Sequence, residues 1–246
     1  MASKAPSVLV FDVNETLLDV DALTPLFAKL FGDADAKASR RAWFDSLVLH
    51  SMALSLQGEA AYVPFPALGG AVLRTLLAAR ADAHMSPSMV DAAVAELGEL
   101  TASLPPHADV SRAILESLRA AGFRLATLSN SPPPPHGTAS ALEIAGLAGC
   151  FEASLSVHAV RRAKPAPEVY AYAAEQLLGS DSSRDVSQLC LVACHPWDLF
   201  GAKAAGWRTA LLVRPGCASL PGVGDPPDVE ADGMADLAKK LSVKWR

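Results

Sequence analysis

Short hydrophobic runs alternate along the chain with longer stretches in which hydrophobic residues recur at helical spacing. The short runs predict strands at 8–11, 123–128, 151–157, 188–193 and 209–213, with an edge strand at 228–231. The first run is hydrophobic at every position, which is typical of a parallel strand covered on both faces. Strands that alternate with helices favour a parallel sheet with right-handed crossovers. The pattern therefore predicts an α/β fold built on one parallel sheet.

The long segment after the first strand has helical periodicity throughout. Within it, Ser86-Pro87 is typical of a helix start. We therefore expect an α/β core formed by residues 1–19 and 105–246, with an inserted helical cap formed by residues 20–104. Because the insertion leaves the sheet directly after the first strand, the cap would cover that edge and enclose a partly desolvated site.

Composition narrows the class of protein. With 246 residues, 51% of them hydrophobic, the chain is suited to a globular fold with a sizeable core. The net charge of −5 and the absence of a basic stripe argue against nucleic acid or an anionic membrane surface as partner. No hydrophobic run approaches the roughly 18 residues of a membrane span. The four cysteines form no CxxC pair, so we expect reduced thiols and a cytoplasmic protein.

Polar residues follow the predicted strands at the carboxyl edge of the sheet, where ligands bind in open α/β folds. They are Asp12, Asn14, Thr16, Ser129, Asn130, Lys164, His195 and Asp198. Structural roles are alternatives: a turn for Ser129 and Asn130, and a helix cap for Asp198. The convergence of an acid, a lysine and a hydroxyl from separate strands favours a nucleophile with its stabilising groups.

The residue types at this edge suit ester-forming chemistry. A carboxylate such as Asp12 attacks a carbon or phosphorus centre and forms an ester. Lys164 would lower the pKa of Asp12 and could hold an anionic substrate. Ser129 and the turn amides would bind negative oxygens. Asp198, with His195, would orient or deprotonate the water that cleaves the ester.

Four motifs together resemble the haloacid dehalogenase superfamily. They are the segments 11–17, 128–130 and 164–165 and a fourth motif that ends at 197–198, in the order and spacing of that superfamily. The resemblance implies a Rossmann-like parallel sheet with an inserted helical cap of the C1 type. It also implies that Asp12 is the nucleophile.

Two positions favour a metal-independent branch of that superfamily. The first motif of its phosphatases has the form Asp-x-Asp-x-Thr, in which the second aspartate is the general acid. Here Asn14 occupies the position of that second aspartate, and an asparagine cannot deliver a proton. The fourth motif of those phosphatases binds Mg²⁺ through acidic residues, whereas here Cys194 occupies one of the acidic positions. A hard cation prefers oxygen ligands, so a strong Mg²⁺ site is not expected. The chain thus resembles the L-2-haloacid dehalogenases, which implies no metal and no cofactor.

This resemblance implies a reaction and a set of residues. Asp12 would displace halide from C2 of a short 2-haloacid, a small anionic organic acid, and water would hydrolyse the aspartyl ester to the 2-hydroxy acid. The expected catalytic residues are Asp12, Lys164, Asp198, Ser129 and Thr16, and the expected substrate-binding residues are Asn130, Tyr170, His195, Arg41, Phe44 and Trp43. A homodimer is expected, because dimers are common among proteins that resemble this one.

Some positions depart from the dehalogenases. Their cap helix has an arginine directly after the tryptophan, and here Phe44 follows Trp43. Arg40 or Arg41 would have to substitute, displaced by about 6 Å along the helix axis. His195 also replaces an asparagine, which changes its charge behaviour near neutral pH. Two alternatives stay open. Stimulation by Mg²⁺ would indicate a small-molecule phosphatase, and affinity for a small acid without turnover would indicate a catalytically weak or inactive binding protein.

Overall fold

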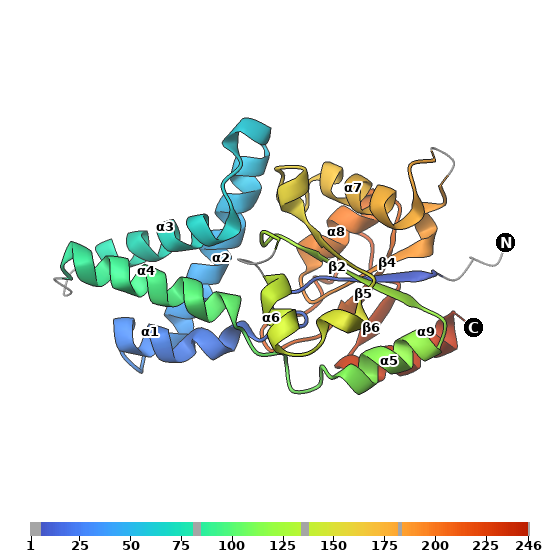
Figure 1. Ribbon diagram of the computed structural model, residues 1–246, viewed down its shortest axis with the longest axis horizontal. Helices are drawn as coiled ribbons and strands as arrows, with labels where there is room; N and C mark the ends of the chain where they lie inside the picture. The colour runs from blue at the N-terminus through green and yellow to red at the C-terminus, as the bar shows by residue number, and fades with distance from the viewer. Residues whose placement is uncertain (1–5, 81–84, 134–137, 182–183, 246) are drawn as a thin grey trace.

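The computed structural model of the chain describes residues 6–80, 85–133, 138–181 and 184–245. Within them, six parallel strands form one sheet in the order β3-β2-β1-β4-β5-β6 (Figure 1). The strands are β1 (Val8–Phe11), β2 (Arg124–Ser129), β3 (Ala153–Ser156), β4 (Leu189–Ala193), β5 (Arg208–Leu212) and β6 (Val229–Ala231). The predicted α/β fold class is confirmed.

Helices cover both faces of the sheet, and side chains alternate between them along each strand. In β1, Val8 and Val10 pack toward one face, whereas Leu9 and Phe11 pack toward the other. The first face is covered by α7 (Pro167–Leu178) and α8 (Pro196–Ala204). The second face is covered by α5 (Arg112–Ala120), α6 (Thr138–Ile144) and α9 (Met234–Lys244). Short 3-10 turns lie in the connections: η3 (Ala148–Cys150), η4 (Val157–Ala159) and η5 (Val186–Gln188). Burial on both faces explains why the first strand is hydrophobic at every position.

The segment after β1 folds as helices that extend from one end of the sheet (Figure 1). Its elements are η1 (Val20–Leu23), α1 (Thr24–Phe31), α2 (Ala36–Ser55), η2 (Glu59–Ala61), α3 (Phe65–Ala78) and α4 (Pro87–Ala102). Helix α3 begins at Phe65, and Pro66 suits its first turn. The side chain of Ser86 caps α4 by accepting a hydrogen bond from the backbone of Met89, as its sequence suggests.

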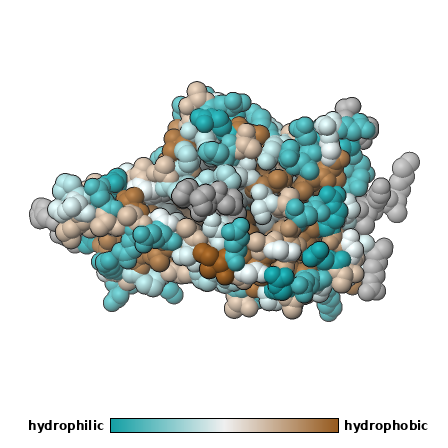
Figure 2. Space-filling model, in the orientation of Figure 1, coloured by the Kyte–Doolittle hydropathy of each residue, from teal (hydrophilic) through white to brown (hydrophobic). Residues whose placement is uncertain are grey.

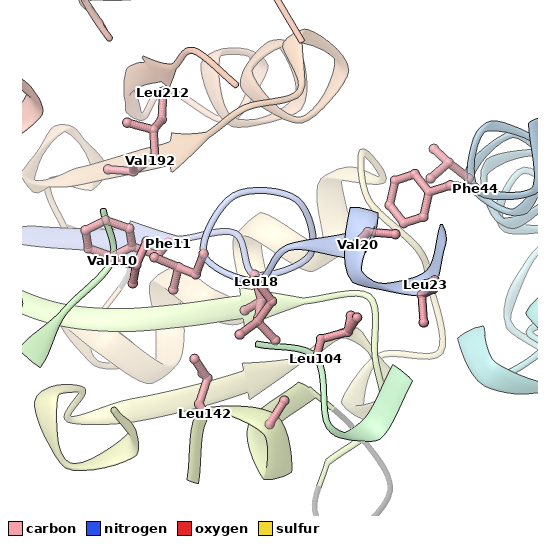
Figure 3. Close-up of a cluster of buried hydrophobic side chains, with 14 of the residues drawn as sticks. Phe11, Leu18, Val20, Leu23, Phe44, Leu104, Val110, Leu142, Val192 and Leu212 are labelled. Atoms are coloured by element: carbon pink, nitrogen blue, oxygen red, sulfur yellow. The ribbon is translucent and has the colours of Figure 1, made fainter. Parts of the chain in front are cut away.

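One hydrophobic cluster continues from the sheet into this helical segment. Figure 3 shows Phe11 and Leu18 near the sheet and Val20 beside Phe44, which comes from the helices. Phe11 and Leu18 are fully buried, and Phe44 is 5% exposed. The helical segment is therefore packed against the end of the sheet, directly above the loop that follows β1.

The surface carries mixed side chains. Figure 2 shows hydrophilic residues over both the helical segment and the sheet end of the visible face, with hydrophobic residues in scattered patches. Among the described residues, no helix is both long enough and apolar enough to cross a membrane.

Close packing between α7 and α8 depends on Gly201, and we expect Gly201→Ala to destabilise the fold. A Cβ atom at this position would lie 2.5 Å from the hydroxyl of Tyr170 and 2.7 Å from Cβ of Pro165. Overpacking of this kind costs about 1–3 kcal/mol of unfolding free energy, which urea denaturation measures.

Gly98→Ala is the matched control for this prediction. Gly98 also lies inside a helix, but nothing lies within 4 Å of the Cβ that the substitution adds. Alanine should therefore stabilise α4 by roughly 0.5–1 kcal/mol. Equal effects of the two substitutions would contradict the packing argument.

Candidate active site

Loops at the carboxyl edge of the sheet bring four predicted site residues together. Asp12 follows β1, Ser129 ends β2, and Asp198 lies in the first turn of α8, which follows β4. Since β1 lies between β2 and β4 in the sheet, these three ends are neighbours. Lys164, from the loop before α7, reaches the same point.

Lys164 is the centre of this cluster. Its ammonium group donates to Oδ1 of Asp12 at 3.0 Å and to Oδ2 of Asp198 at 2.7 Å, and its side chain is completely buried. The other oxygen of Asp198 accepts a hydrogen bond from the hydroxyl of Tyr170 at 2.6 Å. One buried cation therefore bridges two buried carboxylates, which is the arrangement that makes a buried charge tolerable.

Burial and pairing shift the pKa values of these groups in different directions. Burial raises the pKa of Asp12, but the Lys164 ammonium, with His195 and Thr16, outweighs it and holds that pKa well below its usual range. Burial and the charge of Asp12 raise the pKa of Asp198. Burial lowers the pKa of Lys164, but the two carboxylates outweigh it and raise that pKa. Asp12 is thus an ionised carboxylate, and Asp198 is the stronger base of the two acids.

The hydroxyl of Thr16 fixes Asp12. It donates to Oδ2 of Asp12 at 2.7 Å and accepts the backbone N–H of Cys194 at 3.0 Å. Both carboxylate oxygens of Asp12 therefore have a partner, since Lys164 holds the other. A nucleophile held on both oxygens is oriented before a substrate arrives.

Ser129 and Asn130 shape the turn after β2. The Oγ atom of Ser129 accepts the backbone N–H of Ser131 at 3.0 Å, and Oδ1 of Asn130 accepts the backbone N–H of Lys164 at 3.0 Å. Both side chains are buried beside the cluster. Their expected contacts with a substrate stay a prediction.

His195 is held between two aromatic rings and two acids. Its ring stacks on Phe44 at 5.9 Å and on Trp197 at 5.1 Å between centroids. Its Nε2 atom lies 2.9 Å from Oε2 of Glu15, and its Nδ1 atom lies 3.7 Å from Oδ2 of Asp12. The structure thus places His195 next to the nucleophile and Phe44 against the ring of His195; both are among the predicted substrate-binding residues.

The structure places the two candidate arginines of the helical segment differently. Arg41, which was expected to bind substrate, has a half-exposed side chain that pairs with Asp45 and donates to the carbonyl of Gly216 at 2.7 Å. Arg40 is instead the buried arginine, and it pairs with Glu15 at 2.8 Å. The two residues lie about 100° apart around helix α2 and therefore point in different directions. Substrate binding by Arg41 stays a prediction.

An apolar cavity lies between the helical segment and the sheet edge. Trp43, Phe44 and Phe65 line it from the helices, and Asn14 and Ser131 line it from the loops. The indole N–H of Trp43 donates to the carbonyl of Gly69 at 2.8 Å, so the ring acts as a fixed wall. The Oδ1 atom of Asn14 is buried without a hydrogen-bond partner among the described residues. The cavity therefore offers an apolar wall and a small number of polar atoms, as small-molecule sites do.

Two groups in contact with the site lie outside the expected residues. Glu15 has a left-handed backbone with φ of 61°, which turns its carboxylate toward His195. Cys217, from the loop after β5, forms a group with Cys194 and His195. Glu15 stands inside the first motif and carried a signal, whereas nothing in the sequence around Cys217 indicates its position.

Comparison with known proteins agrees with this geometry. The family model of haloacid dehalogenase-like hydrolases matches residues 6–206. Haloacetate dehalogenase H-2 of Moraxella sp. (strain B) is 28% identical over 242 residues, which cover 98% of this chain and 100% of the relative. (S)-2-haloacid dehalogenase 4A of Burkholderia cepacia is 27% identical over 238 residues, which cover 96% and 92%. The crystal structure of an L-2-haloacid dehalogenase matches with a TM-score of 0.82 and 27% identity, over 97% of this chain and 99% of that one. The family-model match covers most of the chain, which therefore belongs to the haloacid dehalogenase-like hydrolase family.

Proposed function

We propose that this hydrolase converts a short 2-haloacid to the 2-hydroxy acid, without a metal ion, through an ester on Asp12. The observation that carries the proposal is the Lys164 ammonium, which bridges Asp12 and Asp198 at 3.0 and 2.7 Å. A fixed cation at this place keeps the nucleophile ionised and supplies the positive charge that a divalent ion would otherwise provide. Two relatives are named as dehalogenases of haloacetate and of (S)-2-haloacids, and these names support this substrate class.

In the first step, a carboxylate oxygen of Asp12 attacks C2 of the substrate. The carbon–halogen bond breaks, and the halide leaves with the bonding electron pair. Thr16 and Lys164 orient the attacking carboxylate. The substrate carboxylate is placed at the turn of Ser129 and Asn130, where hydroxyl, amide and backbone N–H groups can bind it.

In the second step, water attacks the ester carbonyl of Asp12. The bond from that carbonyl to the substrate oxygen breaks, and the leaving oxygen takes the remaining proton of the attacking water. This restores the carboxylate and releases the 2-hydroxy acid. Asp198 takes the proton of the water, because its raised pKa makes it the better proton acceptor. Lys164 stabilises the negative charge that develops on the carbonyl oxygen.

The decisive experiment measures halide release. The substrates are chloroacetate, bromoacetate, fluoroacetate and both enantiomers of 2-chloropropionate, each with excess EDTA and with Mg²⁺. Release that survives EDTA is the expected result. A parallel assay uses p-nitrophenyl phosphate. Phosphate release from it that depends on Mg²⁺, without halide release from the acids, would instead favour the phosphatase alternative. Binding of the acids without turnover would favour the non-catalytic one.

We expect Tyr170→Phe to slow turnover without unfolding the protein. The variant loses the hydroxyl that donates to Asp198 at 2.6 Å, while the ring still fills its buried site. A hydrogen bond to a charged group contributes about 1.5–3 kcal/mol, which corresponds to a decrease in kcat of roughly tenfold to a hundredfold. Steady-state halide release measures the effect.

Tyr172→Phe is the matched control for Tyr170→Phe. Tyr172 lies on the same helix, is partly exposed, and has no hydrogen bond to the cluster among the contacts of the described residues. Its variant should keep wild-type kcat. Equal rates for the two variants would remove Tyr170 from the proposed mechanism.

The proposal includes a cytoplasmic location, no cofactor and a homodimer. Cys150, Cys190 and Cys194 are buried free thiols, and Cys217 is a partly buried free thiol, which agrees with a reducing compartment. Sedimentation analysis of the purified chain tests the dimer, and a monomer at micromolar concentration would contradict it.

A further inference from the structure

Beside the nucleophile lies a group of side chains with the chemistry of a metal site. Cys194 and His195 follow β4, and Cys217 comes from the loop after β5. One ligand atom from each of them lies within 4.8 Å of the other two. Two sulfur atoms and an imidazole are the donors that zinc prefers, and they do not suit magnesium.

The distances suit a tetrahedral ion. Zinc binds sulfur at about 2.3 Å and imidazole nitrogen at about 2.0–2.1 Å, so two such ligands on one ion lie about 3.5 Å apart. The Sγ atom of Cys194 lies 3.4 Å from Nδ1 of His195. These two atoms are therefore already at the separation that a shared ion requires.

The other nitrogen of His195 is oriented as in zinc sites. Ring nitrogens that bind a metal are typically backed by a carboxylate that accepts the N–H of the other nitrogen. Here Nε2 lies 2.9 Å from Oε2 of Glu15, and Arg40 holds that carboxylate in turn. This contact turns Nε2 toward Glu15, so that Nδ1 faces Sγ of Cys194 and would be the nitrogen that binds the ion.

The loop that carries Cys217 is fixed from two sides. The backbone N–H of Cys217 donates to the carbonyl of Arg214 at 2.9 Å, and the buried guanidinium of Arg214 donates to the carbonyl of Thr16 at 2.9 Å. From the helical segment, Arg41 donates to the carbonyl of Gly216 at 2.7 Å. The third ligand is thus held in place by the fold, so little ordering is needed when an ion binds.

We propose that Cys194, His195 and Cys217 form a binding site for zinc, and that bound zinc inhibits the hydrolase. The inhibition rests on the proposed function. Zinc would occupy the Nδ1 atom that lies 3.7 Å from Oδ2 of Asp12, and its charge would lie close to the nucleophile. Lys164 already supplies the cation that keeps Asp12 ionised. A second, divalent cation would stabilise further the negative charge that the attack must transfer, and would so weaken the carboxylate as a nucleophile.

Cobalt(II) tests the site without any substrate. The purified chain is titrated with cobalt(II) under a phosphine reductant, and thiolate-to-cobalt charge transfer is followed by absorption. One equivalent should give the band, and zinc should abolish it by displacement. The absence of a thiolate band in the wild-type chain would overturn the proposal, whatever the enzyme does with haloacids.

Variants identify the ligands. Cys217→Ser should remove the band and weaken zinc binding by at least about a hundredfold, since loss of an outer-shell partner alone costs roughly 10–100-fold. Glu15 is such an outer-shell partner of His195, so Glu15→Gln should weaken zinc binding by roughly 10–100-fold. Cys150→Ala, at a buried cysteine outside the group, should bind like wild type. Wild-type affinity in a folded Cys217→Ser protein, checked by circular dichroism, would overturn the assignment.

Halide release tests the inhibition separately. Zinc at one equivalent should suppress turnover in the wild-type chain and in Cys150→Ala, and should lose this effect in Cys217→Ser. Zinc that binds the wild-type chain without slowing turnover would overturn the inhibition. If no haloacid is turned over at all, the proposed function fails, while the cobalt titration still decides the metal site.

Discussion

Asp12→Asn should reduce halide release by a factor on the order of 10⁴ or more. The amide lacks the negative charge that attacks C2, while its size and its place after β1 are unchanged. Asp45→Asn is the matched control, because Asp45 is an exposed acid on α2 and its variant should keep wild-type turnover. Substantial residual activity in Asp12→Asn would contradict its role as nucleophile.

An isotope experiment separates covalent catalysis from general base catalysis by the same residue. A single turnover with excess wild-type enzyme in ¹⁸O-labelled water should place the label in Asp12 and leave the first product unlabelled. The reason is that the new hydroxyl oxygen of the product comes from the Asp12 carboxylate, and an oxygen atom of water takes its place in Asp12 when the ester is hydrolysed. Mass spectrometry of the peptide that contains Asp12 measures the label. Label in the product and none in Asp12 would show that water attacks the substrate directly.

The fold and the centre of the site could be predicted from the sequence, because both depend on local patterns of hydrophobic and polar residues. A fully hydrophobic run such as Val8–Phe11 has to lie inside a parallel sheet, and the residue that follows has to lie at its carboxyl edge. Asp12 and Asp198 follow neighbouring strands, so their proximity could be predicted. The contact of Lys164 with Asp12 was expected as well. That Lys164 would also pair with Asp198 and be completely buried could not be predicted, because a lysine is usually exposed.

Contacts made by residues outside the motifs were harder to predict. The burial of Arg40 had a readable signal, because Arg40, Phe44 and Leu47 follow helical spacing and share one face of α2. The position of Cys217 had none, because it depends on how a loop after β5 folds back onto the first motif. The stacking of Phe44 on His195 joins the helical segment to the sheet edge, and no local pattern relates the two.

Lys164→Met should abolish turnover and destabilise the protein. The variant keeps a long side chain but leaves Asp12 and Asp198 as two buried carboxylates without their shared cation. Removing one partner from a buried ion pair costs about 3–5 kcal/mol of unfolding free energy. Urea denaturation at neutral pH measures the cost. Lys29→Met removes an exposed ion pair with Glu96 and should change stability by less than about 1 kcal/mol.

A second substitution tests whether the cost arises from the uncompensated carboxylates. Adding Asp198→Asn to Lys164→Met removes one of the two buried charges, and the amide can still accept the hydroxyl of Tyr170. The double variant should recover part of the lost stability, with a coupling energy of about 0.5–3 kcal/mol. Turnover should stay abolished, because neither the cation beside Asp12 nor the base is present. Additive losses of stability would show that Lys164 acts through packing, and that its charge does not hold the two acids together.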